Sequence, residues 1–84
     1  MNVKVLFFAG LREALGTGSE SLALPPGVAT VGHLRDHLAA RGEAWAVLAT
    51  AKNLRVAVNQ QMVAMEAPVK AGDEVAFFPP VTGG

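Results

Sequence analysis

Apolar and polar positions alternate in several short stretches of this chain, and such alternation predicts strands. Residues 2–9, NVKVLFFA, carry β-branched and aromatic side chains on both faces, which is typical of a buried central strand. The same rule predicts four more strands, at residues 19–24, 54–58, 61–65 and 74–78. Only Asn59 and Gln60 separate two of them, so we expect residues 54–65 to form a hairpin.

A helical period replaces the alternation in the middle of the chain. Between Thr30, a candidate N-cap, and Gly42, apolar residues recur every three or four positions and predict one amphipathic helix. These residues are Val31, Leu34 and Leu38. Residues 10–16, GLREALG, predict one or two helical turns. Residues 44–49, AWAVLA, fit either a helical turn or a strand, and we interpret Trp45 as a core side chain.

The order of these elements predicts the fold. One helix that crosses one face of a sheet, with strands before and after it, is typical of the ubiquitin-like β-grasp fold. We therefore predict an α+β domain over residues 1–80, with a mixed sheet of four to five strands and one main helix on one face. Residues 2–9 and 74–78 are the most apolar strands and should lie side by side at its centre. Residues 81–84 should form a flexible tail that ends in two glycines.

Composition and charge exclude several classes of function. The 84 residues suffice for one small domain, and seven basic and seven acidic side chains cancel, so we expect no nucleic-acid binding. We find no apolar run near the roughly 20 residues needed to cross a bilayer, and no signal peptide, so we expect no membrane association. The absence of cysteine excludes thiolate metal sites and a cysteine nucleophile, and it fits a cytoplasmic protein.

The side chains themselves suggest no active site. His33 and His37 lie four apart, but zinc needs three or four ligands and the sequence offers no third, so we expect solvated histidines and no metal. Residues 16–19, GTGS, lack the Lys-Ser/Thr of a phosphate loop and follow a helical segment, so we interpret them as a turn. The acidic residues are scattered singly. We therefore predict a protein without catalytic side chains of its own.

One face of the predicted sheet should be apolar and exposed. Alternation should turn one set of side chains toward the helix, namely Val5, Phe7, Val56, Val58, Val75 and Phe77. Phe8, Ala57, Met62 and Phe78 should then face away from it. Aromatic rings and methionine on an open face are typical of a partner-binding surface. The alternatives are that loops cover this face or that the true register differs by one residue.

The end of the sequence, FFPPVTGG, carries the most unusual chemistry. Pro79 and Pro80 favour an extended exit from the last strand. Gly83 and Gly84 lack Cβ atoms, so they could pass through a channel too narrow for any side chain. A terminal carboxylate is ionised and inert at neutral pH. ATP could activate it as an acyl-adenylate, which sulfur or an amine can attack. A frayed end or a cloning remnant is the alternative interpretation.

Three motifs give the chain a family resemblance. VKVLFFAGLRE near the start, AVNQ at the predicted hairpin and GDEVAFFPPVTGG at the end resemble the small subunit of molybdopterin synthase. This family consists of ubiquitin-like sulfur carriers of molybdenum cofactor biosynthesis. The resemblance spans nearly the whole chain, and the last motif is the most specific.

The resemblance implies a cycle centred on Gly84. A ubiquitin-activating-like adenylyltransferase that uses Mg-ATP would adenylate its carboxylate, and a sulfur donor protein would convert it to a thiocarboxylate. Val81, Thr82 and Gly83 would thread the loaded end into the large subunit of the synthase, where sulfur passes to cyclic pyranopterin monophosphate. No cofactor would stay bound. A thiocarboxylate is an ionised nucleophile at neutral pH, so no cysteine is needed.

The resemblance also implies partner contacts and an assembly. Phe8, Met62 and Phe78 match family positions that contact both the large subunit and the activating enzyme. The synthase would be a heterotetramer with two large subunits at its centre. Two alternatives stay open at this point. The chain could be a related carrier for thiamine, tRNA thiolation or cysteine synthesis, or a protein modifier; or it could be a non-covalent β-grasp binding module.

Overall fold

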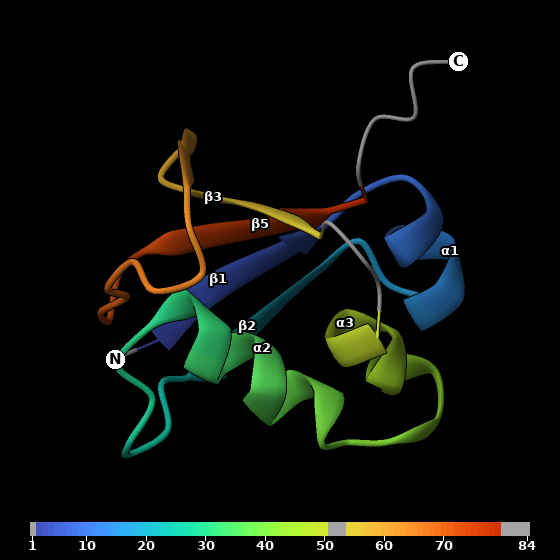
Figure 1. Ribbon diagram of the computed structural model, residues 1–84, viewed down its shortest axis with the longest axis horizontal. Coiled ribbons are helices and arrows are strands. Elements are labelled where there is room, and N and C mark those ends of the chain that lie inside the picture. The colour runs from blue at the N-terminus through green and yellow to red at the C-terminus, as the bar shows by residue number, and fades with distance from the viewer. Residues whose placement is uncertain (1, 51–53, 80–84) are drawn as a thin grey trace.

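Within residues 2–50 and 54–79, which this computed structural model describes, five strands form one mixed sheet in the order β2-β1-β5-β3-β4 (Figure 1). The strands are β1 (Asn2–Phe7), β2 (Ser19–Ala23), β3 (Arg55–Val58), β4 (Gln61–Val63) and β5 (Glu74–Phe78). The helices are α1 (Gly10–Leu15), α2 (Val31–Ala39), the 3-10 helix η1 (Glu43–Ala46) and α3 (Val47–Thr50). The predicted α+β class and mixed sheet are confirmed. The predicted tail, residues 81–84, lies outside the described residues.

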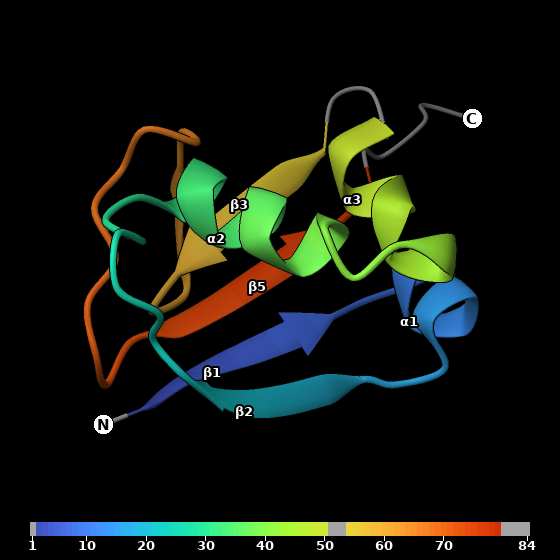
Figure 2. The same ribbon diagram turned by 90° about the horizontal axis from the view of Figure 1, so that it is seen from below.

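The two most apolar strands occupy the middle of the sheet, as predicted. β1 and β5 run parallel, with Val5 opposite Val75 and Phe7 opposite Phe77. β2 pairs antiparallel with the other edge of β1, and β3 pairs antiparallel with β5. Parallel neighbours need a long crossover connection, and here that connection carries α2 across one face of the sheet (Figure 2).

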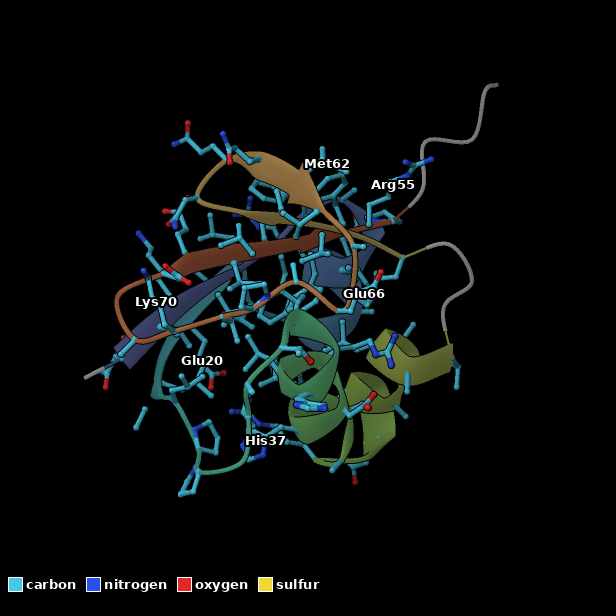
Figure 3. All side chains as sticks on the ribbon, turned by 60° about the vertical axis from the view of Figure 1, so that its left-hand side comes forward. Glu20, His37, Arg55, Met62, Glu66 and Lys70 are labelled. Atoms are coloured by element: carbon cyan, nitrogen blue, oxygen red, sulfur yellow. The ribbon has the colours of Figure 1, made fainter. Side chains whose placement is uncertain are left out.

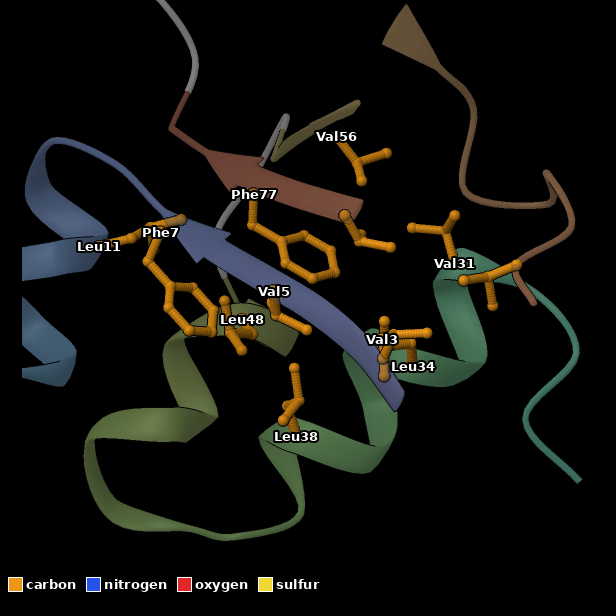
Figure 4. Close-up of a cluster of buried hydrophobic side chains, with 12 residues drawn as sticks. Val3, Val5, Phe7, Leu11, Val31, Leu34, Leu38, Leu48, Val56 and Phe77 are labelled. Atoms are coloured by element: carbon orange, nitrogen blue, oxygen red, sulfur yellow. The ribbon is translucent and has the colours of Figure 1, made fainter. Parts of the chain in front are cut away.

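The buried side chains fill the layer between the sheet and α2 (Figure 4). Val31, Leu34 and Leu38 of α2 are fully buried, which confirms the predicted apolar face of the helix. The Thr30 side chain accepts a hydrogen bond from the backbone N–H of His33 at 3.2 Å, so Thr30 is the predicted N-cap. α2 ends at Ala39, before the predicted Gly42. Beyond it the backbone N–H groups of Arg41 and Gly42 donate to carbonyls three residues earlier, as in a 3-10 turn, and no longer four residues earlier.

The predicted hairpin is confirmed, with a two-residue turn. Asn59 and Gln60 have positive φ values of 51° and 71°, as a type I′ turn requires. The side-chain amide of Asn59 makes two hydrogen bonds. Its Nδ2 donates to the buried Asp73 carboxylate at 3.1 Å, and its Oδ1 accepts from the backbone N–H of Glu74 at 3.0 Å. These bonds fix the hairpin turn against the start of β5.

β4 ends at Val63, two residues before the predicted end. The segment that follows turns toward α2, where the carbonyl of Met65 accepts from the Gly32 N–H at 2.7 Å. A Cβ on Gly32 would lie 3.2 Å from that carbonyl oxygen, so the close approach favours glycine. The strand thus ends before the alternating pattern of residues 61–65 does. The reason is that the Met65 carbonyl accepts from one of the first N–H groups of α2 instead of pairing with a neighbouring strand.

The ambiguous segment at residues 44–49 is helical. The Trp45 ring packs edge-to-face on Phe7, with 5.5 Å between ring centroids, and the Arg41 guanidinium lies 4.5 Å above it. Trp45 is half-buried against the core, which agrees with its interpretation as a core side chain. None of the helices that the structure describes is long and apolar enough to cross a bilayer.

An ion pair joins the segment that follows α2 to the edge strand β2. The Arg41 guanidinium donates to both Glu20 carboxylate oxygens, at 2.8 Å and 2.5 Å. This hydrogen bonding lowers the pKa of Glu20 below its ordinary value, although partial burial opposes the shift. A lowered folded-state pKa contributes stability above the unfolded-state pKa, and that contribution disappears as the pH falls through the folded-state value.

We therefore expect Glu20→Gln to lower the free energy of unfolding by about 0.5–1 kcal/mol at neutral pH, the upper range for a surface pair. In acid well below the ordinary pKa of glutamate, the variant and the wild type should be equally stable. Urea unfolding at both pH values measures the difference. Glu13→Gln, at an exposed acid without an ion pair in the described part of the chain, is the control. A difference that persists unchanged in acid would contradict the assignment.

Candidate functional site

The face of the sheet turned away from the helices carries the large exposed apolar side chains. Phe8 is 48% exposed and Met62 is 57% exposed, and they are the two exposed large hydrophobic residues among those described. Figure 3 shows Met62 on the side of the sheet opposite the helices. The predicted orientation of both residues is therefore confirmed, and their predicted partner contacts remain predictions.

A tight turn holds Phe8 at the end of β1. Ala9 has φ 53° and ψ −131°, a conformation that residues with a Cβ adopt rarely, and the N–H of Leu11 closes the turn on the Phe8 carbonyl at 3.2 Å. The N–H of Phe8 donates to the Phe77 carbonyl at 3.2 Å. β1 thus ends at Phe7 instead of the predicted Ala9, because the chain reverses there into α1.

Phe77 and Phe78 face opposite sides of the sheet, as the alternation predicts. Phe77 is fully buried and stacks on Phe7, with 6.3 Å between ring centroids. Phe78 is half-buried and meets Phe8 edge-to-face, with 6.5 Å between centroids. The last described strand therefore ends with one ring in the core and one on the open face.

Small side chains lie between the larger ones on the open face. Ala57 pairs with Ala76 on one side and with Met62 on the other, and Leu6 pairs with Ala76. Ala57 is only 8% exposed, because strands flank it on both sides. Leu6 and Ala76 were not predicted as part of this surface, although they share the period-two pattern. We call the whole set the outer face: Leu6, Phe8, Ala57, Met62, Ala76 and Phe78.

Of the residues predicted to face the helix, five are buried, namely Val5, Phe7, Val56, Val75 and Phe77. Val58 is only half-buried, because it lies at the hairpin end of β3. The predicted tail residues lie outside the described part of the chain; they are Val81, Thr82, Gly83 and Gly84. β5 ends at Phe78, so the chain leaves the sheet at its centre, beside the Phe8–Phe78 ring pair.

The polar candidates have local structural contacts. Nδ1 of His33 accepts from the Ala29 N–H at 3.3 Å, next to the N-cap of α2. The turn predicted at residues 16–19 covers residues 16–18, in which Gly16 has φ 73° and caps α1, and Ser19 is already the first residue of β2. Across residues 2–50 and 54–79, no three histidine, aspartate or glutamate side chains gather as a metal site would require. We take the open apolar face and the end of β5 beside it as the candidate functional site.

Comparison with known proteins gives matches over nearly the full length. The sequence model of the ThiS family matches residues 5–84. The chain is 49% identical over 82 residues to the molybdopterin synthase sulfur carrier subunit of Escherichia coli (strain K12), covering 98% of this chain and 99% of that protein. It is 46% identical, with the same coverage, to the protein of that name from Haemophilus influenzae.

Solved structures resemble the fold as a whole. SAMP1 from Haloferax volcanii superposes with a TM-score of 0.77 at 30% identity and is covered completely, as is this chain. A second solved structure is a complex of subunits 1 and 2 of the molybdopterin-converting factor from Helicobacter pylori 26695. One of its chains superposes with a TM-score of 0.67 at 24% identity, and the match covers both chains completely. These likenesses confirm the predicted ubiquitin-like β-grasp fold.

Proposed function

The chain belongs to the ThiS family, and on that premise we propose that it is the sulfur-carrier subunit of a molybdopterin synthase. The observation that carries this proposal is the 49% identity to the Escherichia coli sulfur carrier subunit over 98% of the chain. The match extends through the last residue, Gly84, in the family comparison. The reactive group in our proposal is the carboxylate of that residue.

The proposed chemistry needs no side chain of this protein. A ubiquitin-activating-like enzyme uses Mg-ATP to adenylate the Gly84 carboxylate, with pyrophosphate as the leaving group. A sulfur donor protein then supplies the sulfur that displaces AMP and leaves a thiocarboxylate. In the synthase, this sulfur passes to cyclic pyranopterin monophosphate, two loaded chains supply the two sulfur atoms of the dithiolene, and water restores each carboxylate as the acyl C–S bond breaks. ATP belongs to the activating enzyme, so this chain holds no cofactor of its own.

The outer face supplies the proposed docking surface. Exposed aromatic and methionine side chains are enriched where proteins bind one another. Phe8, Met62 and Phe78 lie on the same side of the sheet and beside the end of β5, so a partner bound there would also receive the residues that follow. We propose that the large subunit of the synthase and the activating enzyme use this face in turn. The assembly would be a cytoplasmic heterotetramer.

Intact-mass spectrometry tests the sulfur-carrier proposal. After incubation with Mg-ATP, the activating enzyme and a sulfur source, the mass of the chain should rise by ~16 Da. This is the mass difference when one sulfur atom attacks the activated acyl group and replaces one carboxylate oxygen. The matched control omits ATP and should show no increase. A mass that stays constant in the complete mixture would refute the proposal.

A further inference from the structure

Arg55 adds a charge to the outer face, and this charge constrains the partner. Resting on the proposed function, we infer that Arg55 is a specificity-determining contact that pairs with a carboxylate side chain of the synthase large subunit. This position is not one of the predicted contact residues. The pairing would distinguish the large subunit, which carries the carboxylate, from other proteins whose surfaces are apolar but lack it.

The register of the sheet places Arg55 next to the ring pair. Arg55 is the first residue of β3 and lies directly opposite Phe78, the last residue of β5. It alternates with the buried Val56 and shares a face with Ala57, so its side chain belongs to the outer face. Figure 3 shows Arg55 and Met62 on the same side of the sheet. A partner that covers Phe78 and Met62 must therefore also cover Arg55.

Arg55 has no acidic partner within the described chain. All seven acidic side chains lie in described residues, and the ion pairs found there are Arg35–Asp36 and Arg41–Glu20. In the free protein this is harmless, because Arg55 is exposed to water. In a complex, covering an unpaired guanidinium would cost several kcal/mol unless the partner supplies an acceptor. Carboxylates match the guanidinium fork best, since they can accept two parallel hydrogen bonds.

A hollow beside Arg55 has the chemistry to receive such a side chain. It has a volume of about 320 Å³ and is lined by Leu54, Arg55, Val56, Met62 and Val63. Arg55 supplies a cation to this lining, and polar atoms make up more of the lining surface than apolar atoms do. A glutamate or aspartate that enters it could place its methylene groups against Met62 and its carboxylate on Arg55. A wholly apolar partner side chain would leave the guanidinium unsatisfied.

The carboxylate of Gly84 is a poor partner for Arg55 in the working complex. Gly84 lies five positions beyond Pro79, and an extended segment of that length spans about 17 Å. A tail that enters the large subunit in extended form therefore carries its carboxylate beyond the reach of a side chain beside Phe78. Arg55 would thus act in docking and not on the reacting atoms.

Titration calorimetry of the full chain with the purified large subunit tests the inference. We expect Arg55→Met to weaken binding about 10-fold and Arg55→Glu about 100-fold, because the second places like charges opposite each other. The wild-type affinity should fall as salt is raised, and the Arg55→Met affinity should depend less on salt. Arg35→Met is the matched control, since Arg35 lies on α2, on the other side of the sheet, and should leave binding unchanged.

The outcomes separate this inference from the proposed function. If the wild type binds and transfers sulfur but Arg55→Met binds equally well with the same salt dependence, the inference is wrong and the function stands. If Arg55→Met keeps its affinity and self-associates in sedimentation, Arg55 serves to keep the outer face monomeric, which also overturns the inference. If the wild type does not bind the large subunit at all, the inference and the proposed function fail together.

Discussion

Deletion of Gly84 should abolish sulfur transfer and leave the domain folded. The shortened chain still ends in a glycine carboxylate, but that group would lie about 3.5 Å short of its place in each partner's active site. Misplacement of a reacting atom by 1 Å can already cost about 100-fold in rate. Addition of one residue after Gly84 should have the same effect, because the carboxylate is then displaced in the opposite direction.

Stability should not change in either variant. The buried core of the described chain lies between Val3 and Phe77, and the last strand ends at Phe78. A residue far beyond that strand contributes little to the free energy of unfolding. Urea unfolding, intact mass after thiocarboxylation and a reconstituted synthase assay would be measured on the same samples. Gly84→Ala is the graded control, since it keeps the carboxylate in place and adds only a methyl group.

The deletion has one decisive contrary result. If the chain without Gly84 still gains sulfur and passes it on, the terminal carboxylate is not the reactive group. If Gly84→Ala retains most of the transfer activity that the deletion loses, the position of the carboxylate matters more than the slenderness of the tail. Loss of folding in the deletion variant would instead mean that the tail contributes to the domain.

Much of the fold follows from local patterns. Period-two alternation predicts the strands, and the most apolar pair, β1 and β5, is the central pair. Only alternate residues of these two strands are buried, on the face that packs against the helices, so their other face stays open although the sequence predicts a buried strand. Residues 44–49 could not be assigned in this way. Their helical conformation is accompanied by the packing of Trp45 on Phe7, a contact between residues distant in sequence that no local pattern reveals.

The candidate site is predictable only in part. Alternation places Phe8, Met62 and Phe78 on one face, but it gives no pairing partners. Arg55 lies beside Phe78 only because β3 runs antiparallel to β5 in one particular register. The strained turn at Ala9, which ends β1 and holds Phe8, carries no sequence signal, since alanine is not a residue that favours positive φ. Sheet register and backbone turns therefore supply what side-chain patterns lack.

Phe77→Ala and Phe78→Ala should have opposite effects, although they remove the same atoms from adjacent residues. Phe77 is fully buried and stacks on Phe7, so its truncation should cost about 3–5 kcal/mol of stability. Small domains have only about 5–15 kcal/mol in total, so much of this protein would approach unfolding. Phe78 lies half-buried on the outer face, so its truncation should cost at most about 1 kcal/mol of stability.

Binding should show the reverse order. Phe78→Ala should weaken the complex with the large subunit by about 1–3 kcal/mol, as expected for an aromatic anchor, and Met62→Ala should do the same. Any Phe77→Ala protein that remains folded should bind normally, because that ring never reaches the outer face. Urea unfolding and calorimetry on both variants separate the two quantities. Unchanged affinity with lost stability in Phe78→Ala would mean that this ring belongs to the core, and the outer face would then lose its central anchor.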